Sequence, residues 1–382
     1  AQTEQYYLHS FLEQQPDLNW RNPETRDALL DVLRFWLDRG VDGFRLDVVN
    51  YYFKDAHFRD NPGRAGVYGY LRQRHLYDKD QPEMHDALQE MRRLLDSYPA
   101  RMAVGEVGSD DNAAAAAAYL GAQGDELHLT FNFDFSHSRW SAPAFQRAVE
   151  RWERLVQPHG WPSHVLSNHD LVRHASRYAA GSWTDARARV AAALLLTLRG
   201  TPFIYYGEEI GMRQVEIPRS EVLDPPGKRF WPFFRGRDGC RTPMQWDDSP
   251  NSGFTAGRPW LRVGPDFRTR NVAAQTNDPS SLLTFYRRLI WLRKVTPALV
   301  YGQYRSLIQR PGAALAYLRE TNNQTVLVLL NFSVRPAIVR LDEPLPTDRW
   351  QVLLNTAGWA DEEHLAGPIT LPPYAVCILA AA

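Results

Sequence analysis

The chain has 382 residues and a formal net charge of zero, because 44 Lys and Arg balance 44 Asp and Glu. This length is enough for a large domain followed by a small one. A neutral chain has no basic field for nucleic acid or for an acidic membrane surface, and no apolar run reaches the roughly eighteen residues of a membrane span.

Cysteine usage gives an expectation about the compartment. The chain has two cysteines, Cys240 and Cys377, which lie far apart in the sequence. Two distant cysteines do not make a disulfide framework. We therefore expect a reducing, cytoplasmic location.

The first half of the chain alternates strand and helix signals. Periodicity predicts helices over 23–39, 82–97, 112–120, 142–156 and 184–198, and strands over 43–49, 101–107, 127–135, 163–168 and 202–206. This alternation predicts a parallel sheet with helices outside it. A long Gly- and Pro-rich stretch over 207–280 follows, and loops of this length in a compact domain are normally functional. A further helix is predicted over 281–295.

From about residue 297 the pattern changes to short strands separated by turn signals. Strands are predicted over 314–319, 325–332, 337–341, 350–355 and 375–379. This pattern is typical of a small antiparallel β-sandwich domain.

Three times in the first half of the chain, a carboxylate lies just after a short stretch of strand character, over 43–46, 102–104 and 164–166. These carboxylates are Asp47, Glu106 and Asp170. Side chains at the carboxyl ends of strands form the active sites of βα barrels. Because like charges repel and raise each other's pKa values, a convergent acidic cluster indicates a chemical role.

Asp47 has the features of a nucleophile. Arg45 lies two residues earlier on the same predicted strand, so both side chains face the same way. The arginine favours the ionised carboxylate, which can attack an electrophilic carbon. The alternative interpretation is a structural ion pair, since such pairs also perturb pKa values.

Glu106 and the His169-Asp170 pair suggest complementary roles. Few charges lie beside Glu106 in the sequence, and a Glu in a partly apolar setting can hold a proton and act as a general acid. His169 can donate a hydrogen bond to a hydroxyl, and Asp170 can stabilise positive charge. The alternatives are an exposed strand-end Glu and an Asn-His-Asp turn in which Asn168 caps the next helix.

Three carboxyls with divided roles indicate glycoside hydrolysis. A metal site needs more ligands than the sequence places near His169, so we expect none. Phosphate chemistry lacks its Gly-rich loop with a Lys, and no Gly-x-Ser-x-Gly motif is present.

Several motifs resemble those of one enzyme family. Residues 43–47 (Gly-Phe-Arg-Leu-Asp), 104–106, 166–170 and 15–19 resemble four signature regions of the α-amylase superfamily, glycoside hydrolase family 13. Residues 205–212 and 241–246 are similar to the α-glucosidase and oligo-1,6-glucosidase group within it.

The resemblance implies a role for each matching residue. Asp47 matches the nucleophile, Glu106 the acid/base and Asp170 the transition-state stabiliser. The residues implied to hold the sugar are Arg45, His169 and Arg237, with Arg241 as the alternative to Arg237. Val48, directly after the nucleophile, is the residue that in this group accompanies α-1,6 preference.

The implied activity is that of a retaining, exo-acting α-glucosidase, which hydrolyses or transfers terminal α-glucosyl units of short oligosaccharides. No cofactor is expected in this chain. One alternative is a non-catalytic, amylase-fold ectodomain, which would lack the carboxylates and carry a membrane span. The other is a sucrose-acting glucosyltransferase. The Arg-Leu-Asp-Arg-Asp motif of sucrose-isomerising relatives is absent between Arg213 and Arg237, which favours hydrolysis or transfer over isomerisation.

The resemblance also implies a (β/α)8 TIM barrel, of which this chain supplies about strands 4–8, because a closed barrel of this kind has eight strands. We expect the tail of an inserted loop domain over 1–19, the C-terminal portion of the barrel over 20–300, and an all-β domain over 301–382. The family's first signature is absent, so we expect an N-terminal segment of the same enzyme to complete the barrel and to carry any structural calcium site. Without it, open strand edges would promote aggregation.

Overall fold

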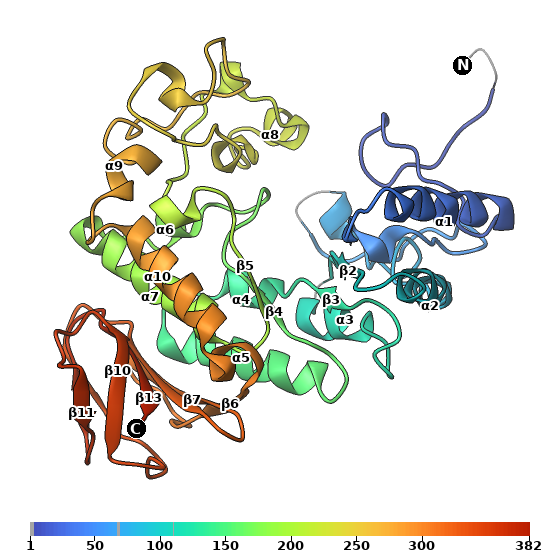
Figure 1. The fold of residues 1–382 in the computed structure, drawn as a ribbon. Coiled ribbons are helices and arrows are strands. Elements are labelled where there is room, and N and C mark those ends of the chain that lie inside the picture. The colour runs from blue at the N-terminus through green and yellow to red at the C-terminus, as the bar shows by residue number, and fades with distance from the viewer. Residues whose placement is uncertain (1–3, 67–68, 110) are drawn as a thin grey trace. The chain divides into compact units, whose positions relative to one another are not determined.

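The computed structural model describes residues 4–66, 69–109 and 111–382 (Figure 1). The chain forms two compact units: unit 1 comprises Ala1–Phe133 and Arg151–Ser163, and unit 2 comprises Asp134–Glu150 and His164–Ala382. The domain boundary predicted near residue 300 falls within unit 2 and stays a prediction. Residues 1–3 of the predicted N-terminal tail lie outside the described residues.

Unit 1 contains a three-stranded parallel sheet in the order β1–β2–β3. Its elements are β1 (Gly43–Leu46), β2 (Met102–Gly105), β3 (Leu129–Thr130), α1 (Pro23–Asp38), α2 (Glu83–Asp96), α3 (Asn112–Ala118) and the 3-10 turns η1 (Val49–Tyr51) and η2 (Tyr70–Arg72). The parallel arrangement predicted for these strands is confirmed, and each predicted helix is present.

The local sequence explains where the unit 1 helices begin and which face they bury. Asn22 accepts a hydrogen bond from the backbone N–H of Glu24, and Pro23 opens α1, which is a common N-terminal arrangement. α2 buries a stripe at helical spacing formed by Met84, Leu88, Met91 and Leu95. This stripe packs with Ala103 of β2 in the core of unit 1.

The segment predicted as a strand over 127–135 is only partly a strand. β3 covers Leu129–Thr130, and a short helix, α4 (Phe133–His137), follows it. The apolar residues recur with period two, which predicted the strand. The backbone N–H of Phe133 instead donates to the side chain of Asn112 at 3.0 Å. The chain then turns into α4, where Phe135 is buried against Phe145 at 5.3 Å between ring centroids.

The first part of unit 2 combines a small sheet with long helices. β4 (Ser163–Val165) and β5 (Thr201–Phe203) form a two-stranded sheet. The helices are α5 (Ala142–Val156), which belongs to unit 2 as far as Glu150, α6 (His174–Arg177), α7 (Thr184–Thr197), α10 (Leu282–Val295) and α11 (Pro297–Tyr301), with the 3-10 turn η3 (Gly181–Trp183). Residues 190–197 of α7 are all buried, as expected for a helix that is apolar on every side.

The stretch predicted as a long loop over 207–280 contains several short elements. These are α8 (Pro225–Phe230), α9 (Val272–Thr276), η4 (Glu208–Ile210), η5 (Arg219–Glu221), η6 (Asp238–Cys240) and η7 (Pro250–Gly253). Side chains hold them locally: Asn271, for example, caps α9 by accepting the N–H of Ala274 at 2.7 Å. Such short elements bury too few residues to produce a periodic sequence signal.

The C-terminal part of unit 2 is an antiparallel sheet in the order β11–β10–β13–β8–β7–β6. The strands are β6 (Gln303–Ser306), β7 (Ala314–Glu320), β8 (Thr325–Asn331), β10 (Arg349–Asn355), β11 (Glu362–His364) and β13 (Val376–Ala381); β9 (Ala337–Val339) and β12 (Ile369–Leu371) form a second sheet. The predicted antiparallel domain is confirmed. The sequence missed β6, β11 and β12, which are short.

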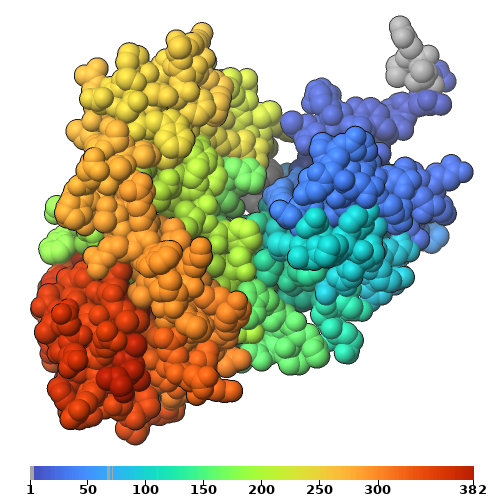
Figure 2. Space-filling view, viewed as in Figure 1, coloured from blue at the N-terminus to red at the C-terminus, as the bar shows by residue number. Residues whose placement is uncertain are grey.

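Alternating side chains on the central strands divide between two cores. In β8, Val326 and Val328 pack in the core that contains α7 and α10. Leu327 and Leu329 face the other way, into the core shared with β9 and β12. In the space-filling view, the red C-terminal sheet and the orange segment that contains α10 meet directly (Figure 2). Across the described ranges, no helix is both long enough and apolar enough to cross a membrane.

Candidate active site

Asp47 and Glu106 lie at the same end of the unit 1 sheet. β1 and β2 are parallel, and Leu46 pairs with Gly105 at their carboxyl ends. Asp47 and Glu106 are the next residues along each strand. The backbone N–H of Glu106 donates to the carbonyl oxygen of Leu46 at 2.9 Å, so the register holds the starting points of the two side chains side by side.

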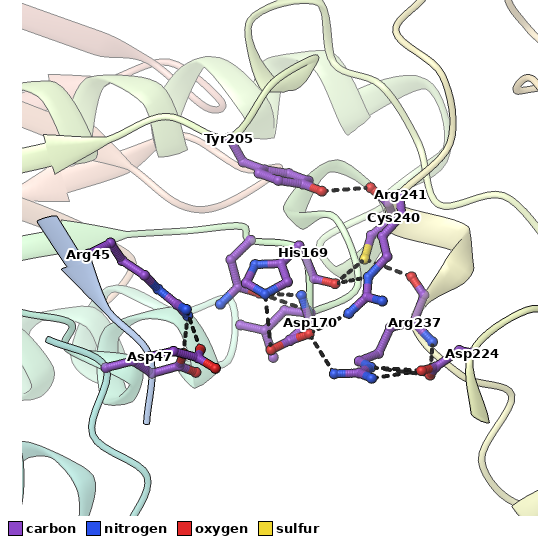
Figure 3. Close-up of polar contacts among 12 residues, drawn as sticks. Arg45, Asp47, His169, Asp170, Tyr205, Asp224, Arg237, Cys240 and Arg241 are labelled. Atoms are coloured by element: carbon purple, nitrogen blue, oxygen red, sulfur yellow. Dashed lines mark hydrogen bonds and ion pairs between the residues drawn. The ribbon is translucent and has the colours of Figure 1, made fainter. Parts of the chain in front are cut away.

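Arg45 contacts both carboxylates. One guanidinium nitrogen donates to Asp47 Oδ1 (Figure 3). Another donates to Glu106 Oε2. The side chain of Asp47 is 66% exposed and that of Glu106 is 15% exposed. The predicted pairing of Arg45 with Asp47 is confirmed. Few charges lie beside Glu106 in the sequence, but the strand register brings Arg45 to it from the neighbouring strand.

Val48 turns the chain immediately after Asp47. Its backbone is left-handed, with φ of 38° and ψ of 49°, a conformation that is unfavourable for a β-branched residue. Backbone strain of this kind concentrates at functional sites. Val48 and Asp47 line a cavity of about 320 Å³ in unit 1, and Asp17 lines the same cavity.

The motif at residues 15–19 is tied to the loop after β1. Asp17 Oδ2 lies 2.7 Å from Lys54 Nζ, and the Lys54 side chain is largely buried. Lys54 also donates to the carbonyl oxygen of Tyr51. This ion pair connects the N-terminal motif to the segment that begins at the candidate nucleophile.

His169 and Asp170 lie in a turn after β4 in unit 2. Asn168 Oδ1 accepts the backbone N–H groups of Asp170 and Leu171, each at 2.8 Å. Asn168 therefore holds this turn, while α6 begins only at His174 with Arg173 as its N-cap. His169 Nε2 lies 3.6 Å from Asp170 Oδ2.

Both arginines that the sequence offered as alternatives contact Asp170. Arg237 donates to Asp170 Oδ1 at 3.0 Å and Arg241 donates to the same oxygen at 2.7 Å (Figure 3). Arg241 also donates to the backbone carbonyl of His169 at 2.7 Å. Asp170 Oδ1 thus accepts from both arginines, while Oδ2 is the oxygen that faces His169.

Sequence reasoning missed Arg173, which is buried in unit 2. It donates to the carbonyl oxygens of Tyr206 at 2.6 Å and Cys240 at 3.0 Å. Its guanidinium also lies 4.9 Å from the ring centroid of Tyr205. Arg173 thus ties the loop after β4 to the segment that carries Arg237 and Arg241. Its position shortly after the His169-Asp170 pair was the available signal.

The structure brings the predicted residues together in two groups. Unit 1 contains Arg45, Asp47, Val48 and Glu106, and unit 2 contains His169, Asp170, Arg237 and Arg241. The convergence of both groups on one substrate stays a prediction. In the parts of the chain that the structure describes, no group of three or more His, Cys, Asp or Glu could hold a metal ion.

Comparison with known proteins identifies the class. A family model described as "Alpha amylase, catalytic domain" matches residues 1–302, and one described as "Maltogenic Amylase, C-terminal domain" matches residues 305–378. The chain belongs to the α-amylase family and combines an amylase-fold catalytic region with a C-terminal antiparallel β domain.

Individual relatives show which members of the family the chain resembles. The chain is 43% identical over 348 residues to a probable alpha-glucosidase of Rhizobium meliloti, a match that covers 88% of this chain and 63% of that protein. It is 34% identical to the oligo-1,6-glucosidase of Parageobacillus thermoglucosidasius, over 95% of this chain and 69% of the relative. The chain therefore spans about two thirds of the length of these curated relatives.

The chain also superposes on solved structures of related enzymes. An alpha-glucosyl transfer enzyme superposes with a TM-score of 0.88 at 39% identity, over 99% of this chain and 71% of that one. A trehalulose synthase superposes with a TM-score of 0.85 at 31% identity, over 98% of this chain and 72% of that one.

Proposed function

We propose that the complete protein is a retaining, exo-acting α-glucosidase that hydrolyses short α-glucosides and also transfers glucosyl units. The observation that carries this proposal is the contact of Arg45 with both Asp47 and Glu106 at the carboxyl ends of two parallel neighbouring strands. Adjacent strand ends suit the separation of roughly 5–5.5 Å between carboxyl groups that retention requires.

The proposed reaction has two displacements. Asp47 attacks the anomeric carbon while Glu106 gives its proton to the departing glycosidic oxygen, which leaves a covalent glucosyl–enzyme. Glu106 then removes a proton from water or from a sugar hydroxyl, and that oxygen displaces Asp47 with a second inversion. Asp170 stabilises the positive charge that develops on the sugar in both steps.

The names of the relatives support both water and a sugar hydroxyl as the acceptor of the glucosyl unit. The names of the compared proteins include alpha-glucosidase, oligo-1,6-glucosidase and an alpha-glucosyl transfer enzyme. Val48 after the nucleophile supports α-1,6 preference. Sucrose isomerisation is the second candidate, because trehalulose and isomaltulose synthases share the fold. The missing arginine-rich motif between Arg213 and Arg237 weighs against it.

We further propose that this chain supplies about strands 4–8 of a (β/α)8 barrel and that a preceding segment of the same enzyme completes it. The curated relatives support this proposal, because the chain covers only 63% and 69% of the lengths of the two compared above. We propose no cofactor for the reaction, since the two-carboxylate mechanism needs none. Two free, buried cysteines support a cytoplasmic location.

The anomeric form of the first product tests the mechanism. Incubation of the complete protein with maltose, isomaltose and sucrose, followed by NMR within the first minutes, should show α-glucose appearing before mutarotation. An initial excess of β-glucose would overturn retention. Asp47→Asn should lower kcat by about 10⁴-fold or more, as loss of a catalytic nucleophile does. An unchanged rate would instead support the non-catalytic alternative.

A further inference from the structure

Asp224 has an unusual use for a residue at the start of a helix. It occupies the N-cap position of α8, yet its side chain accepts no N–H group of that helix. Pro225 and Pro226 follow it and have no N–H to donate. An Asp at an N-cap normally accepts a backbone N–H there. The carboxylate of Asp224 is therefore directed to another partner.

That partner is Arg237, which lies between two carboxylates. Arg237 donates to Asp224 Oδ1 from one terminal nitrogen at 2.7 Å and to Asp224 Oδ2 from Nε at 3.2 Å. Its other terminal nitrogen donates to Asp170 Oδ1 at 3.0 Å. In Figure 3, Asp224 and Asp170 flank the Arg237 guanidinium on opposite sides. The Asp224 side chain is fully buried.

The contacts connect four charged side chains in unit 2. Asp170 and Asp224 carry two negative charges, and Arg237 and Arg241 carry two positive charges. Burial raises the pKa of Asp224, but hydrogen bonds from Arg237 outweigh it, so the net pKa lies below the usual value. Asp224 is therefore ionised near neutral pH, and the four charges cancel.

We propose that Asp224 is a charge-balancing positioning residue, which neutralises Arg237 so that the negative charge of Asp170 remains available to a cationic transition state. The inference rests on the proposed glucosidase function. Without Asp224, the remaining charges sum to plus one and oppose the positive charge that develops on the sugar. The effect belongs to the transition state, because the ground-state sugar is neutral.

A second buried carboxylate in the same loop provides a matched control. Asp238 Oδ2 accepts the backbone N–H groups of Leu223 at 2.6 Å and Asp224 at 3.0 Å. Among the described residues, no hydrogen bond or ion pair joins the Asp238 side chain to Arg237 or Arg241. Asp238 thus holds the loop without balancing the arginines, and Asp238→Asn reports the cost of loosening the loop alone.

The experiment compares Asp224→Asn, Asp238→Asn, Arg237→Gln and the double variant Asp224→Asn/Arg237→Gln in the complete protein. We expect D224N to lower kcat by about 10- to 100-fold, as a unit charge acts through an effective dielectric constant of about 20. KM should change by less than about threefold, since the neutral ground-state sugar binds D224N about as well as it binds the wild type. Thermal unfolding of each variant gives the folded fraction by which kcat is corrected.

The double variant separates charge from structure. Removing Arg237 together with Asp224 restores the cancellation, so we expect the double variant to turn over at least about threefold faster than D224N. A double variant no faster than D224N would overturn this inference but not the proposed function. The same holds for a D238N variant that loses as much kcat as D224N at unchanged KM. A wild-type protein that cleaves no α-glucoside would overturn the proposed function as well.

Discussion

Glu208 and His174 form a buried polar pair in unit 2. Glu208 Oε2 lies 3.7 Å from His174 Nδ1, and Tyr286 donates its hydroxyl to Glu208 Oε1 at 3.0 Å. Burial raises the pKa of Glu208 to about 8 and lowers the pKa of His174 to about 3. Both side chains are therefore predominantly uncharged near pH 7.

The raised pKa of Glu208 gives a pH-dependent prediction. Below pH 4.5 the Glu208 carboxyl is protonated in both the folded and the unfolded protein. Between pH 4.5 and about 8 the folded protein keeps this proton, whereas the unfolded protein releases it. The contribution of Glu208 to stability is therefore lost as pH rises through this window. Because Gln imitates the protonated acid, the unfolding free energy of Glu208→Gln should increase relative to wild type from pH 5 to pH 8 in urea titrations.

The control for this titration is Glu216→Gln. The side chain of Glu216 is 91% exposed, and its ion pair with Arg235 has a separation of 3.5 Å. Exposed pairs of this kind contribute little to stability. Glu216→Gln should therefore differ from wild type by a nearly constant amount across the same pH range. A constant difference for Glu208→Gln would contradict the buried-acid interpretation.

At the scale of elements, α10 depends on a side-chain cap. Ser281 Oγ accepts the backbone N–H of Thr284 at 3.1 Å and donates to the carbonyl oxygen of Gln275 at 2.8 Å. Ser281→Ala should lower the free energy of unfolding by about 1 kcal/mol, the usual value for an N-cap. The neighbouring Ser280→Ala is the control, because Ser280 is exposed and its hydroxyl donates to Asp278 rather than capping the helix. Equal losses in urea titrations would argue against the cap.

α10 also closes the end of α7. Arg293 donates to the carbonyl oxygens of Leu196 at 2.8 Å, Leu198 at 2.9 Å and Gly200 at 2.5 Å. Arg293→Met should cost about 3 kcal/mol or more, because charge-assisted hydrogen bonds are lost and buried carbonyls are left unpaired. Arg293→Lys should recover part of this loss, since an ammonium group can donate to some of the same carbonyls. Equal stability of the two variants in denaturant titrations would contradict this account.

At the scale of the whole molecule, two helices expose large apolar side chains. In unit 1, α1 exposes Trp36 at 47%, with Val32 and Phe35 nearby in sequence. In unit 2, α10 exposes Trp291 at 63%, with Ile290 beside it. Apolar patches of this kind normally meet a partner. We propose that the preceding segment of the enzyme covers these exposed side chains.

This attribution predicts self-association of the chain produced alone. Sedimentation velocity should show concentration-dependent association, which Trp36→Glu and Trp291→Glu reduce, because each places a charge on an exposed apolar face. Phe233→Glu is the control, since Phe233 is 99% exposed and lies on neither of these helices. A monomer at all concentrations, or equal effects of all three variants, would contradict the prediction.

Much of the fold follows from local sequence. The helices over 23–38 and 282–295 and the longer strands of the C-terminal sheet carry periodic patterns that a window of ten to fifteen residues contains. The strand predicted over 127–135 is only partly correct, because its period-two pattern does not reveal that Asn112 accepts the N–H of Phe133 and ends the strand early. The short elements between 207 and 280 bury too few residues to give a periodic pattern, and α9 is the one among them that begins at a side-chain cap.

The sequence by itself determined the family, the alternation of strands and helices, and the identities of Asp47, Glu106 and Asp170 as strand-end carboxylates. The tertiary structure decided which charges these carboxylates meet. Arg45 reaches Glu106 across 61 positions, and Arg237 reaches Asp170 across 67. The physical reason is that motifs and periodicity are local, whereas the charge around a carboxylate depends on strand register and on how distant loops pack.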